Sequence, residues 1–230
     1  MKDILIITGS VGGREKMPIT GLQGPLGHNN NCNYDNCDYL AIDDEHKQFQ
    51  KSDWKNTNSY IPFSSIDKYK ERRNCKLYKI LNTILYPNYK YIVWHDANVS
   101  LIGDPNEIIK QHADADIIIG PHRQRGCLYD EINLVNKMEL DASETLKQQK
   151  AYYKLQGVPK KYGLWHCNAV IMKNTTAVKK FQLMWWEQIC KFSSRDQISF
   201  AYCAYKMKDE IQIASSNLKY RLVSRSWKRL

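Results

Sequence analysis

Short apolar runs alternate along the chain with longer stretches in which apolar residues recur every three or four positions. Buried strands are predicted at Ile4–Ile7, at 116–120 and in the run that rises to Trp94, because each is short, apolar and bounded by polar or turn-forming residues. The longer period predicts helices at 66–86 and Thr175–Phe192. Helices that alternate with strands in this way are typical of an α/β sheet.

Local signals predict five further elements. These are a strand at 38–42, a helix capped by Asp104, a helical stretch at 129–155 with a break near Asp141, a strand at 164–172, and a helix that begins near Ser194. A glycine-rich turn is expected at 8–14 and a long loop at 18–37. A chain of 230 residues is long enough for one domain with a sizeable core, so a single domain over 1–230 is expected.

The strand that rises to Trp94 is followed by Asp96 and Asn98, which are separated only by Ala97. On an extended chain, residues i and i+2 point to the same side, so two oxygen-bearing side chains aim at one point. Mg²⁺ and Mn²⁺ accept oxygen ligands from few protein groups and take the rest from water and phosphate. The pair therefore suggests a metal that holds a nucleotide diphosphate. An ordinary turn is the alternative, because Asp and Asn favour turns.

Composition limits the classes of function. The formal charge of +10 suits a partner that carries phosphate, such as a nucleotide, a nucleic acid or a membrane surface. A nucleic-acid-binding domain remains an alternative, although the chain has no helix-turn-helix, zinc-finger or aromatic ribonucleoprotein signature. No apolar run approaches the roughly 18 residues of a transmembrane helix, and the first apolar stretch is too short for a signal peptide. The seven cysteines lack Cys-x-x-Cys spacing, which favours free thiols and a cytoplasmic location over a zinc site.

Two more groups of polar residues could carry chemistry: His166 with Asn168 in a predicted strand, and Asp196 with Gln197 at a predicted helix start. Sugar transfer from a nucleotide sugar needs such groups. A cation and basic side chains stabilise the departing diphosphate, and a carboxylate can act as general base at the acceptor hydroxyl. The structural alternatives are a capping box formed by Ser194 and Gln197, and a histidine that only supports the strand.

Seven sequence blocks follow one another between about residues 70 and 207. They are Arg73-x-x-Lys76-x-x-Lys79, Ile92-Val93-Trp94-His95-Asp96-Ala97-Asn98, Pro121-His122-Arg123, Cys127–Glu131, Gly163-Leu164-Trp165-His166-Cys167-Asn168, Trp185-Trp186-Glu187 and Ser194–Phe200. In this order they resemble GT-A glycosyltransferases. The nearest likeness is to a glycosyltransferase-like family found in plant cell-wall (mucilage-type) proteins, bacteria and large DNA viruses. Asn168-Ala169-Val170 followed by Asp196-Gln197 also resembles a motif pair of glycogenin-type transferases.

The resemblance implies a Rossmann-like, mixed but mostly parallel sheet flanked by helices. It implies a nucleotide-binding half at 1–100 and a half for the donor sugar and the acceptor at 101–230. The implied activity moves a sugar from a nucleotide sugar, expected to be a UDP-sugar, to a hydroxyl of a glycan or glycoprotein. The implied cofactor is Mn²⁺ or Mg²⁺, with no nucleic acid as partner. A catalytically silent carbohydrate-binding protein of the same fold is the alternative, since fold alone does not give function.

The resemblance also implies roles for individual residues. Asp196 would be the catalytic carboxylate, with a preference for inversion and with retention as the alternative. Asp96 and Asn98 would bind the metal, and His166 would contact the acceptor or be a third metal ligand. The donor would lie against Thr8, Gly9, Arg73, Lys76, Lys79, Asp96, Asn98, Asn168 and Gln197. The three basic residues of the first block could instead form a solvated helix face.

Overall fold

A seven-stranded mixed sheet runs through the molecule in the order β3-β2-β1-β4-β7-β6-β8. The structure is a computed structural model that describes residues 2–11, 36–43, 55–57, 63, 68–97, 99–216 and 219–222. The strands of the sheet are β1 (Ile4–Ser10), β2 (Cys37–Asp43), β3 (Lys55–Thr57), β4 (Tyr91–His95), β6 (Ile117–Pro121), β7 (Trp165–Lys173) and β8 (Ile213–Ser215). Only β7 runs antiparallel to its neighbours among these strands, so the predicted mixed, mostly parallel sheet is confirmed.

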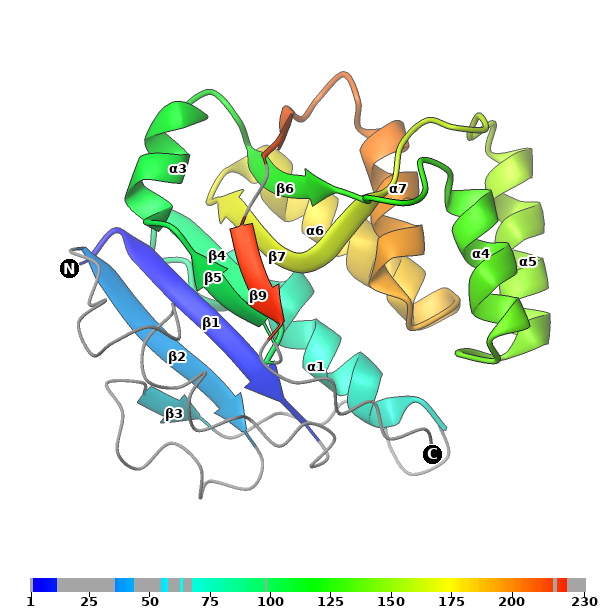
Figure 1. Cartoon of the computed structure of the whole chain (residues 1–230), viewed down its shortest axis with the longest axis horizontal. Helices are drawn as coiled ribbons and strands as arrows, with labels where there is room; N and C mark the ends of the chain where they lie inside the picture. Colours follow the sequence, from blue (N-terminus) through cyan, green and yellow to red (C-terminus); the bar gives the residue numbers. More distant parts are fainter. Residues whose placement is uncertain are drawn as a thin grey trace.

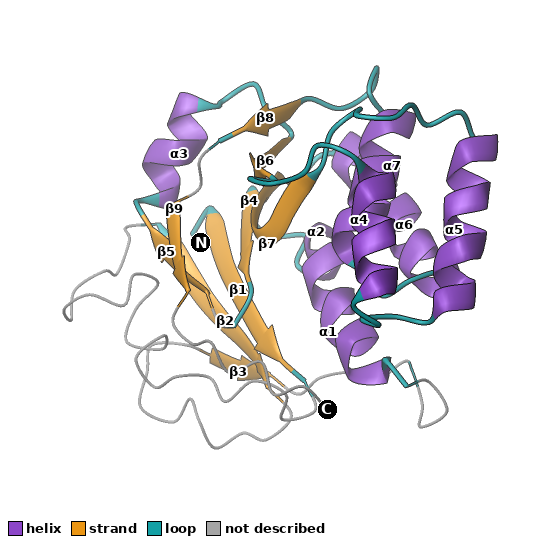
Figure 2. Cartoon of the chain, turned by 45° about the vertical axis from the view of Figure 1, so that its right-hand side comes forward, coloured by secondary structure: helices purple, strands orange, loops and turns teal. Residues whose placement is uncertain are grey.

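Helices cover the sheet unequally (Figures 1 and 2). They are α1 (Lys70–Ile80), α2 (Asn82–Leu85), α3 (Pro105–Gln111), α4 (Leu128–Lys137), α5 (Ser143–Leu155), α6 (Thr176–Lys191) and α7 (Asp196–Lys206). One face packs against α1, α2, α6 and α7, and α4 and α5 form a further layer beyond α7 (Figure 2). The other face carries α3 and a small antiparallel sheet of β5 (Val99–Ile102) and β9 (Lys219–Leu222).

Successive side chains of a strand point to opposite faces of the sheet, so the same strands contribute to two hydrophobic cores, one on each face. On β1, Leu5 and Ile7 face the larger helical layer, whereas Ile4 and Ile6 join the smaller core beneath α3. Trp94 of β4 and Trp185 of α6 are almost fully buried in the larger core. Because residues i and i+2 of a strand share a face, two-sided burial requires the continuous apolar runs that the sequence shows.

Most predicted boundaries are confirmed, because local interactions set them. The side chain of Asp104 accepts a hydrogen bond from the backbone N–H of Asn106, and Thr175 caps α6 through the N–H of Val178. The predicted break near Asp141 separates α4 from α5.

Other expectations need correction. The helix predicted at 66–86 is interrupted at Leu81, which separates α1 from α2. The turn predicted from Thr8 onward is wrong up to Ser10, because β1 continues through these residues in register with β2. The remainder of that turn, at 12–14, and residues 18–35 of the loop predicted at 18–37 lie outside the described residues. The end of that loop is wrong at Cys37, where β2 begins. The strands β3, β5, β8 and β9 had no recognised sequence signal.

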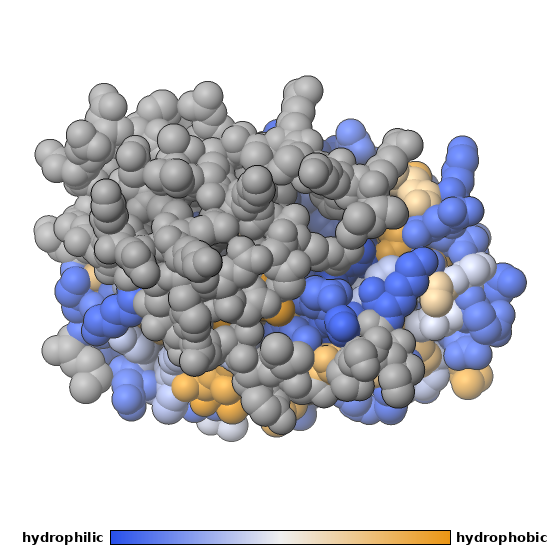
Figure 3. Space-filling view, turned by 90° about the horizontal axis from the view of Figure 1, so that it is seen from below, coloured by the Kyte–Doolittle hydropathy of each residue, from blue (hydrophilic) through white to orange (hydrophobic). Residues whose placement is uncertain are grey.

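The described surface is mainly hydrophilic on the face shown in Figure 3, where apolar residues form separate small groups. None of the helices described has both the length and the apolar character needed to cross a bilayer. The six cysteines in the described ranges all carry free thiols, and the cytoplasmic location inferred from cysteine usage stays a prediction.

Candidate active site

Two carboxylates that are far apart in the sequence meet at the carboxyl end of β4. Asp96 follows this strand and Asp196 is the first residue of α7. The ammonium group of Lys79 lies between them, 3.0 Å from Asp96 Oδ1 and 2.7 Å from Asp196 Oδ2. Lys76 approaches the same oxygen of Asp196 at 2.6 Å. The structure thus brings four of the predicted site residues into one hydrogen-bonded cluster.

Helix α1 delivers both lysines, because residues three positions apart share a helix face. Their side chains are only 13% (Lys76) and 1% (Lys79) exposed. The interpretation of a solvated face is therefore wrong for these two residues. Arg73 points elsewhere: its guanidinium group donates to the backbone carbonyls of Ile189 and Phe192, at the end of α6. The structure does not bring Arg73 to the carboxylates.

Mutual attraction favours the charged forms of Lys79 and Asp196. Burial lowers the pKa of Lys79, but attraction to Asp196 and Asp96 outweighs it, so this pKa is raised above its ordinary value. Burial raises the pKa of Asp196, but Lys76 and Lys79 together hold it well below the ordinary 3.8. Asp196 is accordingly an ionised carboxylate with little affinity for a proton while both lysines contact it.

Asp96 has one oxygen committed and one open. Its Oδ1 accepts hydrogen bonds from Trp94 Nε1 at 2.9 Å and from Lys79. Its Oδ2 has no hydrogen-bond partner in the described part of the chain, and the side chain is 27% exposed. Its backbone N–H donates to the carbonyl of Asn168 at 2.7 Å, which ties the end of β4 to β7.

The open oxygen suits a divalent cation that takes its other ligands from water and phosphate. Within the described ranges, no three His, Cys, Asp or Glu side chains are grouped so that they could hold a metal ion. Asn98, the second predicted ligand, lies outside the described residues. Among the described residues of the cluster, Asp96 Oδ2 is thus the oxygen that would be open to a cation, and the other ligands would have to come from substrate and water.

A bulge in β7 shapes the wall beside Asp96. Ile119 pairs with Val170, but the next residue of β6, Gly120, pairs with His166. The extra residues of β7 include Asn168, whose carbonyl is the one that Asp96 contacts. Bulges of this kind re-aim side chains beside active sites.

His166 belongs to a neighbouring group. Its Nε2 accepts a hydrogen bond from the backbone N–H of Arg123 at 3.1 Å, and its ring stacks on His122 with 4.2 Å between centroids. Burial, His122 and nearby arginines lower the pKa of His166 to about 4, so it is neutral at pH 7. With Nε2 as acceptor, the proton of the neutral ring is on Nδ1. Only Nδ1 could then meet a substrate, and Nε2 is not available as a metal ligand.

The end of β1 lies next to β4, with Ile7 opposite Trp94. Thr8 is 1% exposed, and its Oγ1 has no hydrogen-bond partner in the described part of the chain. Gly9 is explained by packing, since a Cβ there would lie 3.2 Å from both Ile42 Cβ and Trp94 Cη2. The unpartnered hydroxyl of Thr8 is thus the better candidate for a ligand contact.

The start of α7 is not a capping box. The N-cap is Arg195, and Ser194 Oγ instead donates to Asp141 Oδ2 at 2.7 Å. The backbone N–H of Gln197 donates to Asp196 Oδ1 at 3.1 Å, so the carboxylate itself satisfies a free N–H of the first turn. The capping-box alternative is therefore wrong, and both oxygens of Asp196 have donors.

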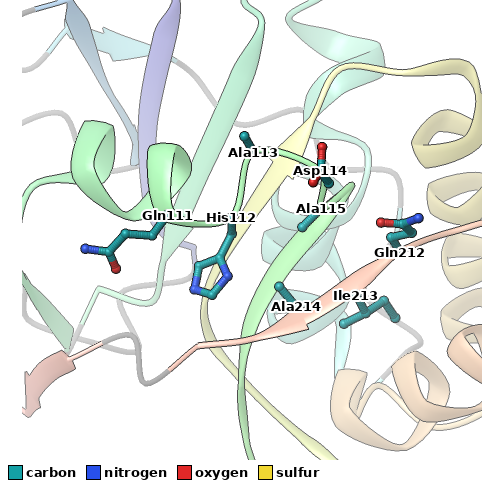
Figure 4. Close-up of a pocket in the computed structure, with 8 residues that line it drawn as sticks. All are labelled: Gln111, His112, Ala113, Asp114, Ala115, Gln212, Ile213 and Ala214. Carbon is teal, nitrogen blue, oxygen red and sulfur yellow. The ribbon is translucent and has the colours of Figure 1, made fainter.

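A separate hollow lies at the amino ends of β6 and β8, away from the cluster around Asp96 (Figure 4). Its volume is about 270 Å³, and it is lined by Gln111, His112, Ala113, Asp114, Ala115, Gln212, Ile213 and Ala214. These residues lie just before β6 and at the start of β8. Because β6 and β8 run parallel to β4, the hollow is at the amino ends of these strands, opposite the carboxyl end of β4 where Asp96 lies. It contains none of the predicted site residues.

Comparison with known sequences decides the family. The model of one family, described as "TOD1/MUCI70, glycosyltransferase-like domain", matches residues 21–223. The chain belongs to this family. The resemblance inferred from the seven blocks is thereby confirmed. A curated relative, described as "Probable hexosyltransferase MUCI70" from Arabidopsis thaliana, is 23% identical over 188 residues, or 72% of this chain. The chain spans about a third (32%) of the length of that relative.

The fold of the TOD1/MUCI70 domain also has a solved counterpart. The crystal structure of mouse xyloside xylosyltransferase 1, in its apo form, matches with a TM-score of 0.55 and 9% sequence identity. The match covers 94% of this chain and 84% of the mouse chain. The predicted GT-A type of α/β fold is confirmed by this likeness.

Sequence reasoning missed several residues around the site of the TOD1/MUCI70 domain. Trp94 was taken only as the end of a strand, yet its indole N–H fixes Asp96. Arg72 and Asp141 support the segment before Asp196, and His122 stacks on His166. His122 lies in one of the seven blocks, whereas Arg72 and Asp141 carried no local signal beyond a helix and a break.

Proposed function

We propose that this domain transfers a sugar from a nucleotide sugar, of the UDP class, to a hydroxyl of a glycan, with the help of a divalent cation. The observation that carries the proposal is the cluster of Asp96, Lys79, Asp196 and Lys76 at the carboxyl end of β4. Ligands of open α/β sheets bind at this end of the strands. Family membership and the GT-A fold support the same reaction class.

The reaction breaks the bond between the anomeric carbon and the diphosphate, and forms a bond from the acceptor oxygen to that carbon. The departing diphosphate needs cationic partners, and preorganised charges supply them at little reorganisation cost. Lys76 is the more accessible cation, with 13% of its side chain exposed, and we assign it to the diphosphate. Lys79 is almost wholly buried and holds the two carboxylates in place.

Asp96 is the proposed metal ligand, through the oxygen that Trp94 and Lys79 leave open. A cation bound there would neutralise charge on the diphosphate as it departs. Asn98 is the proposed second contact, to the cation or to the ribose.

Asp196 is the proposed general base of an inverting reaction. Two lysines now hold its pKa below the ordinary value, which makes it a weak base. When the diphosphate engages Lys76, one of these charges is shared with the substrate, and the proton affinity of Asp196 rises toward what the step requires. Retention, with Asp196 and Gln197 against the β-face of the sugar, is the alternative. The anomeric configuration of the product distinguishes the two.

Asn168 and Gln197 are the proposed partners of the donor-sugar hydroxyls, and Thr8 and Gly9 line the nucleoside side. His166 is the proposed acceptor contact, because its neutral ring has Nδ1–H as its remaining donor and is about half-buried beside His122. Two neutral, stacked imidazoles offer a flat surface and a hydrogen-bond donor to a sugar ring.

The test is a panel of nucleotide sugars, with Mn²⁺ or with a chelator, scored by release of the nucleoside diphosphate. Turnover that needs one donor and the cation supports the proposal. Binding of a donor without turnover, with any acceptor glycan, would instead indicate a silent carbohydrate-binding protein. A salt-dependent shift with RNA or DNA, and none with nucleotide sugars, would favour the nucleic-acid alternative.

A further inference from the structure

A buried carboxylate, that of Asp141, helps to tie the corner between α6 and α7 to the rest of the molecule. This residue lies in the link between α4 and α5, and its side chain is 1% exposed. Its Oδ2 accepts hydrogen bonds from Ser193 Oγ at 2.9 Å, from the backbone N–H of Ser194 at 2.9 Å, and from Ser194 Oγ at 2.7 Å. Asp196 follows two residues later, so these bonds fix the backbone that leads to it.

Helix α1 holds the same corner from another side. Arg72 Nη1 donates to Ser194 Oγ at 3.0 Å and lies 3.7 Å from Asp141 Oδ2. One helical turn further along α1, Lys76 reaches Asp196 at 2.6 Å. Residues four positions apart share a helix face, so the contacts at Arg72 and at Lys76 are mechanically linked. The separation between the lysine and the carboxylate is therefore set in part at Asp141.

We propose that Asp141 is a positioning residue, whose carboxylate fixes Ser193 and Ser194 and thereby holds Asp196 against the two lysines. The inference rests on the proposed function, because it takes Asp196 to be the reacting carboxylate. A displacement of about 1 Å in a reacting group can cost on the order of 100-fold in rate. The proposed function assigns donor binding mainly to Asp96 and Lys76, and Asp141 contacts neither of them.

A carboxylate that only stabilised the fold would behave differently, and Asp116 provides the matched control. Its Oδ2 accepts from the backbone N–H of Gln212 at 3.0 Å, and its Oδ1 accepts from Thr175 Oγ1 at 3.3 Å. Asp116 directly precedes the amino end of β6. Because β6 runs parallel to β4, this position is at the opposite end of the strands from Asp96. Asp116 also accepts from one backbone N–H and one hydroxyl, and these donors belong neither to the corner at Ser193 and Ser194 nor to the cluster around Asp196.

The experiment compares Asp141→Asn and Asp116→Asn with the wild-type chain. Asparagine has nearly the same size as aspartate but carries no charge. In one orientation its amide nitrogen faces the three donors, which then lose their acceptor; in the other, a neutral carbonyl oxygen replaces the carboxylate. For Asp141→Asn we expect kcat to fall about 10- to 100-fold while the donor KM stays within about threefold. For Asp116→Asn we expect lower thermal stability with kcat unchanged. A kcat of Asp141→Asn equal to that of the control variant would overturn the inference.

A second readout needs no turnover. We expect backbone amide hydrogen exchange at Ser194 and Gln197 to be faster in Asp141→Asn and unchanged in Asp116→Asn, and unchanged exchange in both would also overturn the inference. Should Asp141→Asn fail to fold, Ser194→Ala removes only one of the donors, and we expect a smaller fall in kcat at constant KM. A wild-type chain without any transferase activity would refute the proposed function. The exchange data would still show whether Asp141 fixes the backbone before Asp196.

Discussion

Replacing Lys79 by methionine tests the charge arrangement on which the proposed chemistry depends. The ammonium group is 1% exposed and lies 3.0 Å from Asp96 and 2.7 Å from Asp196. Methionine fills similar space without charge. Removal of one partner from a buried ion pair costs about 3–5 kcal/mol, because the remaining charge stays buried. We expect about 3 kcal/mol, since Lys76 still contacts Asp196 and Asp96 is partly exposed.

This loss should depend on pH in a defined direction. In the wild-type chain the pKa of Asp196 is lowered, so its stabilisation is present above the ordinary 3.8 and is lost only as pH falls below that value. In Lys79→Met, burial still raises this pKa but Lys76 alone opposes it, so Asp196 binds a proton at higher pH. Protonation removes the uncompensated charge. The deficit of the variant is therefore expected to be full near pH 7 and smaller near pH 4.

Scanning calorimetry at the two pH values measures the effect. For a chain of this size, about 3 kcal/mol corresponds to roughly 6–12 °C in Tm. Lys76→Met is the matched control. Its side chain is 13% exposed and, within the described residues, its ammonium group pairs with Asp196 alone, so a smaller loss is expected. A Lys79→Met protein as stable as the wild type, or a deficit that is the same at both pH values, would refute the reasoning.

Three further predictions concern the reaction. Asp96→Ala should abolish Mn²⁺-supported turnover of the nucleotide sugar, and normal turnover in this variant would remove the metal assignment. Asp196→Asn should lower kcat about 100-fold or more with a much smaller change in donor binding, as expected for loss of a general base; equal losses in both would indicate a structural role. Thr8→Val removes an unpartnered buried hydroxyl and should leave Tm unchanged or slightly higher, because no hydrogen bond within the described chain is lost. Calorimetric titration should show weaker nucleotide binding by this variant, and unchanged affinity would exclude Thr8 from the donor site.

Features that depend on neighbouring residues were predictable. The caps of α3 and α6 are hydrogen bonds between a side chain and an N–H two or three residues away, so the sequence motif is also the structural cause. The buried strands β1 and β4 were recognisable because burial on both faces demands a continuous apolar run. The strands β3 and β8 were missed because each has three residues and exists only through pairing with a partner strand.

For the candidate site, too, some features could be predicted from the sequence and others could not. The sequence supplied the residue types and the order of the blocks, and this order was sufficient to recognise the family. The sequence did not distinguish the roles of the basic residues of α1, because they recur every three positions and were therefore expected on one helix face. Arg73 ends at the carbonyls of α6, whereas Lys79 ends between two carboxylates.

By itself, then, the sequence determined where the longer helices and the buried strands form, and which chemical groups the chain offers at their ends. Only the tertiary structure decided that Asp96 and Asp196 share one lysine, and that Asp141 supports the segment before Asp196. The physical reason is that these contacts join segments distant along the chain. Periodicity and capping act over a few residues, whereas charge pairing and side-chain burial depend on which surfaces the packed elements bring together.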